Sequence, residues 1–173
     1  MKKDLLLRFG ADAKTLYDKP KESYGPITVA EAHNLFLRLG KAYSVFLENV
    51  STPSKNNSTA FTNLNDEGIY SWNHERPAIL ISSTSWTEDE DFGILLRALQ
   101  DYDNAASQED NPQFPNLLCV ITGKGPQKED YKRRISKQVC KYVLIIVRIC
   151  GNFLFPVFRS NNLLYINKIN TLF

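Results

Sequence analysis

Hydroxyl side chains gather in one short segment of the chain, directly after an apolar run at 78–81. Hydroxyls and backbone amides at the end of a buried strand can bind a phosphate or a sugar hydroxyl. Serine and threonine are equally common as plain turn and cap residues, so both interpretations stay open. The acids at 88–91 favour a sugar or ribose hydroxyl over a phosphate. The candidate ligand-binding residues here are Ser83, Thr84, Ser85, Trp86 and Thr87.

A second candidate is the turn Gly123-Lys124-Gly125-Pro126. Glycines let backbone amides approach a ligand closely, and Lys124 supplies a positive charge on a flexible stem. The turn lacks the spacing of a Walker loop or of GxGxxG, so it also fits a plain connection between a strand and a helix. Gly123, Lys124 and Gly125 are nevertheless the stronger candidates for binding a phosphate.

Other chemistry is not indicated by the residue pattern. The two histidines, His33 and His74, lie far apart, and the cysteines at 119, 140 and 150 form no paired spacing. His33 beside an apolar helix face is typical of a packed side chain, and Asp101 and Asp103 near a helix end are expected to be solvated. The sequence therefore predicts no metal, no cofactor and no nameable catalytic residue.

The order of the elements that must position these loops, between residues 77 and 126, is typical of half of a Rossmann-type domain. We expect buried strands at 78–81 and 117–121, an intervening helix opened by a Thr87–Glu90 capping box, and a basic helix at 128–137. Two such units favour a parallel pair of strands. The fold class predicted from this order is α/β.

The rest of the chain divides by composition. A helix at 1–9 and a helix opened by a Thr28–Glu31 capping box precede a polar stretch, 51–74, which we interpret as a linker or long surface loop. The end of the chain, 139–173, carries four basic residues and no acid. Its first 20 residues could just cross a bilayer, but Arg148 disfavours this, and a tail without selected structure is the alternative.

The net charge of the chain argues against a nucleic-acid partner. The net charge of +2 over 173 residues is too small to indicate a nucleic-acid surface, and no zinc-finger spacing or arginine-rich run is present. We therefore expect no nucleic-acid partner.

Several phrases resemble one family: YDKP at 17–20, LFLRLG at 35–40, TAFT at 59–62, RPAILISSTSWTEDEDFGILLRAL at 76–99 and LLCVITGKGP at 117–126. Over about residues 1–138 the chain is similar to the chitobiosyldiphosphodolichol beta-mannosyltransferases. The resemblance implies a GT-B fold of two Rossmann-like domains. It also implies mannose transfer from GDP-mannose to dolichol-linked chitobiose, with inversion to a beta-1,4 link, at the cytosolic face of the endoplasmic reticulum membrane.

Mapped onto this sequence, the resemblance implies four parts. Residues 1–50 would end the acceptor-side domain, 51–74 would link, 75–138 would begin the donor-side domain, and 139–173 would lie outside the family pattern. Ser83 to Thr87 and Gly123 to Pro126 would face the donor. We expect a truncated chain with little or no activity alone. The alternatives are a non-catalytic fragment that docks on other glycosyltransferases of the pathway, and an aberrant product that is degraded.

Overall fold

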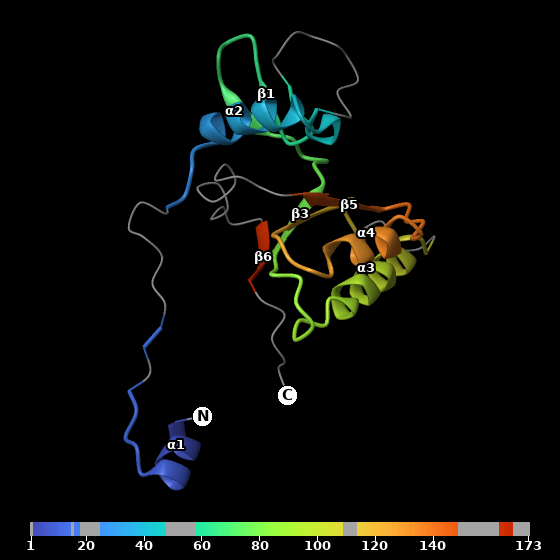
Figure 1. Ribbon diagram of the computed structural model, residues 1–173. Coiled ribbons are helices and arrows are strands. Elements are labelled where there is room, and N and C mark those ends of the chain that lie inside the picture. Colours follow the sequence, from blue (N-terminus) through green and yellow to red (C-terminus); the bar gives the residue numbers. More distant parts are fainter. Residues whose placement is uncertain are drawn as a thin grey trace.

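The computed structural model describes residues 2–14, 16–17, 25–47, 58–108, 114–148 and 163–167. The helices are α1 (Lys2–Phe9), α2 (Val29–Gly40), a short 3-10 helix η1 (Ser44–Phe46), α3 (Gly93–Ala106) and α4 (Lys128–Ile135). The strands are β1 (Thr62–Leu64), β2 (Tyr70–Trp72), β3 (Ala78–Ser83), β4 (Leu117–Thr122), β5 (Val143–Arg148) and β6 (Leu163–Asn167). Figure 1 shows α3 and α4 on one side of the larger sheet and α2 with β1 on the other.

The larger sheet has four parallel strands in the order β5-β4-β3-β6. Ser83 at the end of β3 is level with Thr122 of β4 and with Asn167 of β6, and Thr122 is level with Arg148 of β5. All four strands therefore end at one edge. The chain steps outward from β3 to β5 and then returns to the other side of β3. The predicted α/β class and the parallel pairing of the two strands are confirmed.

Both faces of the central β3–β4 pair are covered, which explains why these two strands are continuous apolar runs rather than alternating ones. Leu80 of β3 and Cys119 of β4 pack with the buried leucines of α3 and with Tyr131 of α4. Their neighbours in the strands, Ile79, Ile81, Leu118 and Val120, point to the opposite face. There they meet Ala32 and Phe36 of α2, together with Phe46 and Phe61.

The helix α2 begins with the predicted capping box. The Thr28 hydroxyl accepts from the Glu31 amide at 3.2 Å, and the Glu31 carboxylate accepts from the Thr28 amide at 2.7 Å. These hydrogen bonds favour the charged form and lower the pKa of Glu31. The box fixes where α2 starts, and so which of its side chains face the sheet.

Parts of the stretch 51–74 differ from the expected linker or surface loop, whereas residues 65–68 are an exposed turn. Residues 62–64 and 70–72 pair as the antiparallel strands β1 and β2, and Phe61 and Thr62 are buried. Thr62 is accommodated because its hydroxyl bonds the Thr59 hydroxyl at 2.8 Å and Nδ1 of His33 at 3.0 Å. His33 is thus a packed side chain, as predicted. Residues 48–57 lie outside the described part, and the predicted domain boundaries stay predictions.

The end of the chain also differs from the expectation of a tail without structure. Residues 143–148 and 163–167 form β5 and β6, one on each side of the β3–β4 pair. The run VLIIV in β5 has the β-branched, apolar composition of a buried parallel strand, which accounts for its place in the sheet. In the described ranges, no helix has the length and apolarity needed to cross a membrane. Residues 149–158 of the considered span lie outside those ranges.

Asp103 was expected to be solvated, and the structure shows that this is wrong. Asp101 is exposed, but Asp103 is 5% exposed. Its carboxylate accepts hydrogen bonds from three successive amides, those of Lys141 at 3.2 Å, Tyr142 at 2.6 Å and Val143 at 3.2 Å. Asp103 of α3 therefore holds the start of β5 in place.

Cys119 makes the stability of the fold sensitive to alkaline pH. Burial raises the pKa of its thiol from 9.0 to about 12. Between these values the unfolded chain releases a proton that the folded chain retains, so stability present below pH 9.0 is lost as pH rises. We expect urea midpoints to fall more steeply between about pH 8 and about pH 10.5 for the parent chain than for Cys119→Ala. Equal slopes in the two proteins would contradict this assignment.

Candidate functional site

Two loops leave the sheet side by side at the edge where the strands end. Residues 84–92 connect β3 to α3 (the β3–α3 loop), and residues 123–127 connect β4 to α4 (the β4–α4 loop). Since Ser83 and Thr122 are register partners, the two loops start next to each other. All eight residues that the sequence singles out therefore lie at this edge: Ser83, Thr84, Ser85, Trp86 and Thr87 on one strand end and loop, and Gly123, Lys124 and Gly125 on the other. Their part in ligand binding stays a prediction.

The two glycines of the β4–α4 loop are explained by the neighbouring loop. Gly123 has φ +121°, and a Cβ on it would lie 1.7 Å from the carbonyl oxygen of Thr84. A Cβ on Gly125 would lie 1.7 Å from the carbonyl oxygen of Ser85. The Gln127 amide also donates to the carbonyl of Trp86 at 3.1 Å. The glycines are required for the loops to interlock, whatever else they contact.

Trp86 holds the β3–α3 loop against the hydrophobic core. It has φ +52°, which is rare for a bulky residue, and its side chain is 1% exposed. The indole ring packs against Phe92 at 4.7 Å and Tyr131 at 5.7 Å between ring centroids. This packing leaves the ring almost no exposed face for a ligand. Trp86 instead ties the loop to α4 and to the core below it.

The expected Thr87–Glu90 capping box is wrong, because α3 begins only at Gly93 and Phe92 at its N-cap makes no side-chain cap bond. The carboxylate of Glu90 turns back into the loop instead. It accepts from the Ser85 amide at 3.1 Å, from the Ser85 hydroxyl at 3.1 Å and from the Thr84 hydroxyl. With 7% exposure, Glu90 is the buried organiser of the β3–α3 loop. Sequence reasoning missed this role.

The β4–α4 loop presents hydrogen-bond donors. Within the described part of the chain, the backbone amides of Lys124 and Gly125 make no hydrogen bond, and the Lys124 side chain is exposed. Lys128 is 8% exposed, and its ammonium donates to the carbonyl of Gly123 at 3.0 Å, which stabilises the loop from its buried side. Such a loop offers amide donors and positive charge to an anionic group.

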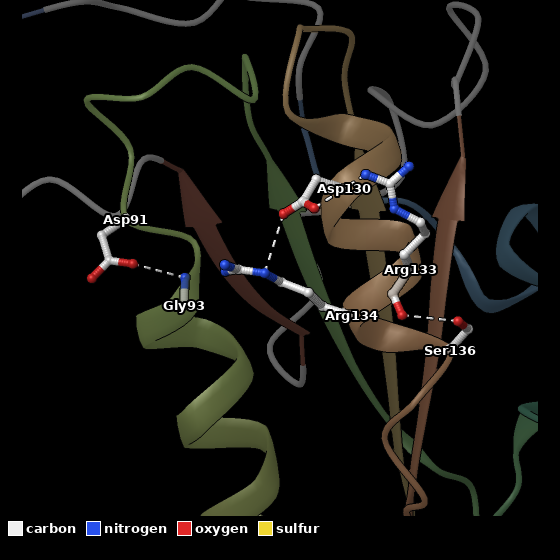
Figure 2. Close-up of polar contacts among 6 residues, drawn as sticks. All are labelled: Asp91, Gly93, Asp130, Arg133, Arg134 and Ser136. Atoms are coloured by element: carbon white, nitrogen blue, oxygen red, sulfur yellow. Dashed lines mark hydrogen bonds and ion pairs between the residues drawn. The ribbon is translucent and has the colours of Figure 1, made fainter.

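Two acids near this edge, Asp91 and Asp130, have local partners. Figure 2 shows Asp130 of α4 with the side chains of Arg133 and Arg134, at 3.3 and 3.1 Å. It also shows Asp91 accepting from the Gly93 amide at 2.9 Å, where α3 starts. All of these side chains are exposed, so the pairs contribute little to stability. Their effect is to offset negative charge beside the loops. In the ranges given above, no group of three or more His, Cys, Asp or Glu side chains could hold a metal ion.

Comparison with known proteins identifies relatives of this chain. It is 43% identical to the chitobiosyldiphosphodolichol beta-mannosyltransferase of Mus musculus over 146 residues, which are 83% of this chain and 30% of that protein. It is 39% identical to the Homo sapiens protein of the same name over 148 residues, 84% of this chain and 31% of that protein. It is 38% identical to UDP-glycosyltransferase TURAN of Arabidopsis thaliana over 161 residues, 83% of this chain and 34% of that protein.

The chain spans about a third of the length of these curated relatives. No family model matches the sequence, and no solved structure matches the fold. The matches nevertheless cover most of this chain. The mouse and human relatives among them carry the same enzyme name. The parallel α/β sheet with loops at its carboxyl edge agrees with part of a GT-B glycosyltransferase. Over most of its length, the chain is therefore related to the chitobiosyldiphosphodolichol beta-mannosyltransferases, a family of glycosyltransferases.

Proposed function

We propose that this chain forms part of the donor-binding half of a mannosyltransferase that uses GDP-mannose. The acceptor would be dolichol-linked chitobiose, and the transfer would invert the anomeric carbon to give a beta-1,4 link. The proposed location is the cytosolic face of the endoplasmic reticulum membrane. The support for the acceptor is the name of the mouse and human relatives.

One observation carries the proposal: the two interlocked loops stand together at the carboxyl edge of a parallel sheet. In open α/β sheets, ligands bind outside this edge, where the strand order reverses. Here the order reverses at β3, which lies between β4 and β6. The β3–α3 loop leaves from that strand and lies against the β4–α4 loop, so a nucleotide sugar bound at this edge could contact both loops.

The role proposed for the β4–α4 loop is electrostatic stabilisation. During transfer, the acceptor hydroxyl oxygen forms a bond to the anomeric carbon of mannose and gives up its proton to a base. The bond between that carbon and the diphosphate breaks, and negative charge grows on the leaving diphosphate. The Lys124 ammonium and the amides of Lys124 and Gly125 would stabilise that charge. The described residues offer no group that we assign as general base. Because the chain spans about a third of its relatives, we expect little or no mannose transfer by the chain alone.

Binding of GDP-mannose to the purified chain tests the proposal directly. By isothermal titration calorimetry, Lys124→Ala is expected to weaken binding about tenfold, since a charge-assisted contact contributes about 1.5 kcal/mol. Lys137→Ala, an exposed lysine just after α4, is the matched control and should leave the affinity within about twofold of the parent. No GDP-mannose binding by the parent chain, or equal losses in the two variants, would overturn the proposal.

A second candidate function is that of a non-catalytic fragment that docks on other glycosyltransferases of the pathway. The observation that favours it is the row of exposed apolar side chains in and after α1, where Leu7 is 85% exposed, Phe9 72% and Leu16 94%. Exposed apolar groups of this kind favour protein association. Co-purification with such a transferase, without GDP-mannose binding, would support this function over the first.

A further inference from the structure

We propose that Glu90 fixes the direction of the hydrogen bonds in the β3–α3 loop, so that this loop recognises ligand hydroxyl groups. The neighbouring β4–α4 loop would then recognise phosphate. The inference rests on the proposed function. It assigns the hydroxyl groups of the nucleotide sugar to the β3–α3 loop and its diphosphate to the β4–α4 loop. Glu90 is a positioning residue in this scheme, because it acts through Ser85 and Thr87 rather than by touching the ligand.

The starting point is the environment of the Glu90 carboxylate. Three donor groups face it: the Thr84 hydroxyl, the Ser85 amide at 3.1 Å and the Ser85 hydroxyl at 3.1 Å. An ionised carboxylate only accepts hydrogen bonds, so each of these groups must direct its hydrogen at Glu90. The single hydrogen of the Ser85 hydroxyl is therefore committed to Glu90.

The next contact follows from that commitment. The Ser85 and Thr87 hydroxyl oxygens lie 3.1 Å apart, close enough for either to donate to the other. Since Ser85 has already directed its hydrogen at Glu90, Thr87 must be the donor in this pair. The chain of hydrogen bonds thus runs from Thr87 through Ser85 to Glu90. We call these three residues the hydroxyl relay.

The relay has a defined polarity at its outer end. Thr87 directs its single hydrogen at Ser85, so its oxygen can only accept further hydrogen bonds. Thr87 is half-buried, so part of this residue stays accessible to a ligand. Lone pairs accept from a sugar or ribose hydroxyl, which can donate. They are unsuited to a fully ionised phosphate oxygen, which cannot donate and would meet the charge of Glu90 behind them. The hydroxyl groups of the β3–α3 loop consequently form an acceptor surface.

The β4–α4 loop has the opposite polarity, because it offers the amides of Lys124 and Gly125 and the Lys124 ammonium. A Cβ on Gly125 would collide with the carbonyl of Ser85, so the two surfaces are in direct contact. A ligand with adjacent phosphate and hydroxyl groups, such as a nucleotide sugar, matches this pair of surfaces.

The test compares three probes on the purified full chain by calorimetry: GDP-mannose, GDP and inorganic diphosphate. Thr87→Val removes the outer acceptor and is expected to weaken GDP-mannose binding about tenfold, with diphosphate binding unchanged within about twofold. Thr87→Ser keeps the hydroxyl and should restore the parent affinity. Glu90→Gln, which lets an amide nitrogen donate to Ser85, should reproduce the Thr87→Val result. Glu88→Gln, the same charge change at an exposed position, should not.

The GDP arm identifies which hydroxyl is recognised. A loss seen with both GDP and GDP-mannose assigns the relay to the ribose, and a loss seen with GDP-mannose alone assigns it to the mannose. If the Glu90→Gln chain does not fold, the Thr87 pair still decides the question. Equal affinities of Thr87→Val and Thr87→Ser for GDP-mannose would overturn this inference and leave the proposed function standing. Failure of the parent chain to bind any of the probes would overturn both.

Discussion

Replacing Asp103 with alanine is expected to lower the free energy of unfolding by about 3 kcal/mol or more, because three amides lose a charged acceptor. The carboxylate is 5% exposed and accepts from the amides of Lys141, Tyr142 and Val143 at 2.6–3.2 Å. Alanine would leave those amides without a partner at the start of β5. Urea denaturation followed by tryptophan fluorescence or circular dichroism measures the change.

The matched control is Asp101→Ala, which removes an exposed carboxylate from the same helix and should change stability by no more than about 0.5 kcal/mol. Asp103→Asn is informative as well. The single side-chain oxygen of asparagine can accept from only some of the three backbone amides, and its NH2 group would face the remaining amide donors. We therefore expect Asp103→Asn to be nearly as unstable as Asp103→Ala. A loss below about 1 kcal/mol in Asp103→Ala would contradict the role assigned to this carboxylate.

The second large effect is expected at Gly123, where alanine should cost about 3 kcal/mol or more by two separate mechanisms. Its φ of +121° is unfavourable for any residue with a Cβ, and the added Cβ would lie 1.7 Å from the carbonyl oxygen of Thr84. That oxygen belongs to the backbone and cannot turn away as a side chain could. The two loops would have to separate, and the packing of Trp86 beneath them would loosen.

Gly68 separates the two mechanisms, because it also has positive φ, at +79°, but a Cβ added there would meet no atom within 4 Å. Gly68→Ala should therefore show only the backbone cost, about 1 kcal/mol. Gly125→Ala should show mainly the collision, with the carbonyl of Ser85 at 1.7 Å. Thermal melting of the three variants gives the comparison. If Gly123→Ala is no less stable than Gly68→Ala, the interlock of the loops is not as described.

The central α/β unit could be predicted from the sequence because its signals are local. The apolar runs at 78–81 and 117–121 lie within β3 and β4, and the basic helix expected from residue 128 begins there. The Thr28–Glu31 box was also predictable, since both partners lie within one helical turn. In each case, neighbours in the sequence supply the contact that decides the structure.

The parts that could not be predicted depend on side-chain contacts that no helical or strand period indicates, and several of these contacts join residues distant in the sequence. Asp103 looks like a solvated helix residue until the sheet brings in the amides of 141–143. Glu90 has the spacing of a cap, but Thr84 and Ser85 compete for its carboxylate. The hydroxyls of 59–62 read as a polar linker, although they satisfy one another and His33 in a buried cluster.

The candidate site was predicted as segments rather than as side chains with roles. The hydroxyl-rich turn and the glycine turn were both identified, and the parallel register places them together. Only the three-dimensional structure shows which residues of these two turns pack inward. Trp86 and Thr84 are buried, whereas Ser85 and Lys124 are exposed. Composition carries no signal for that distinction, because each residue is common in both settings.

The pairing of β6 with β3 bears on how the chain is made. Residue 163 is the register partner of residue 79, whereas residue 117 already pairs with residue 78. During synthesis, β3 and β4 can associate long before β6 leaves the ribosome, and closing the longer loop is slower. Until then, β3 carries an open row of amides and carbonyls that another nascent chain could join. Co-translational chaperone capture should therefore peak between the emergence of β4 and that of β6.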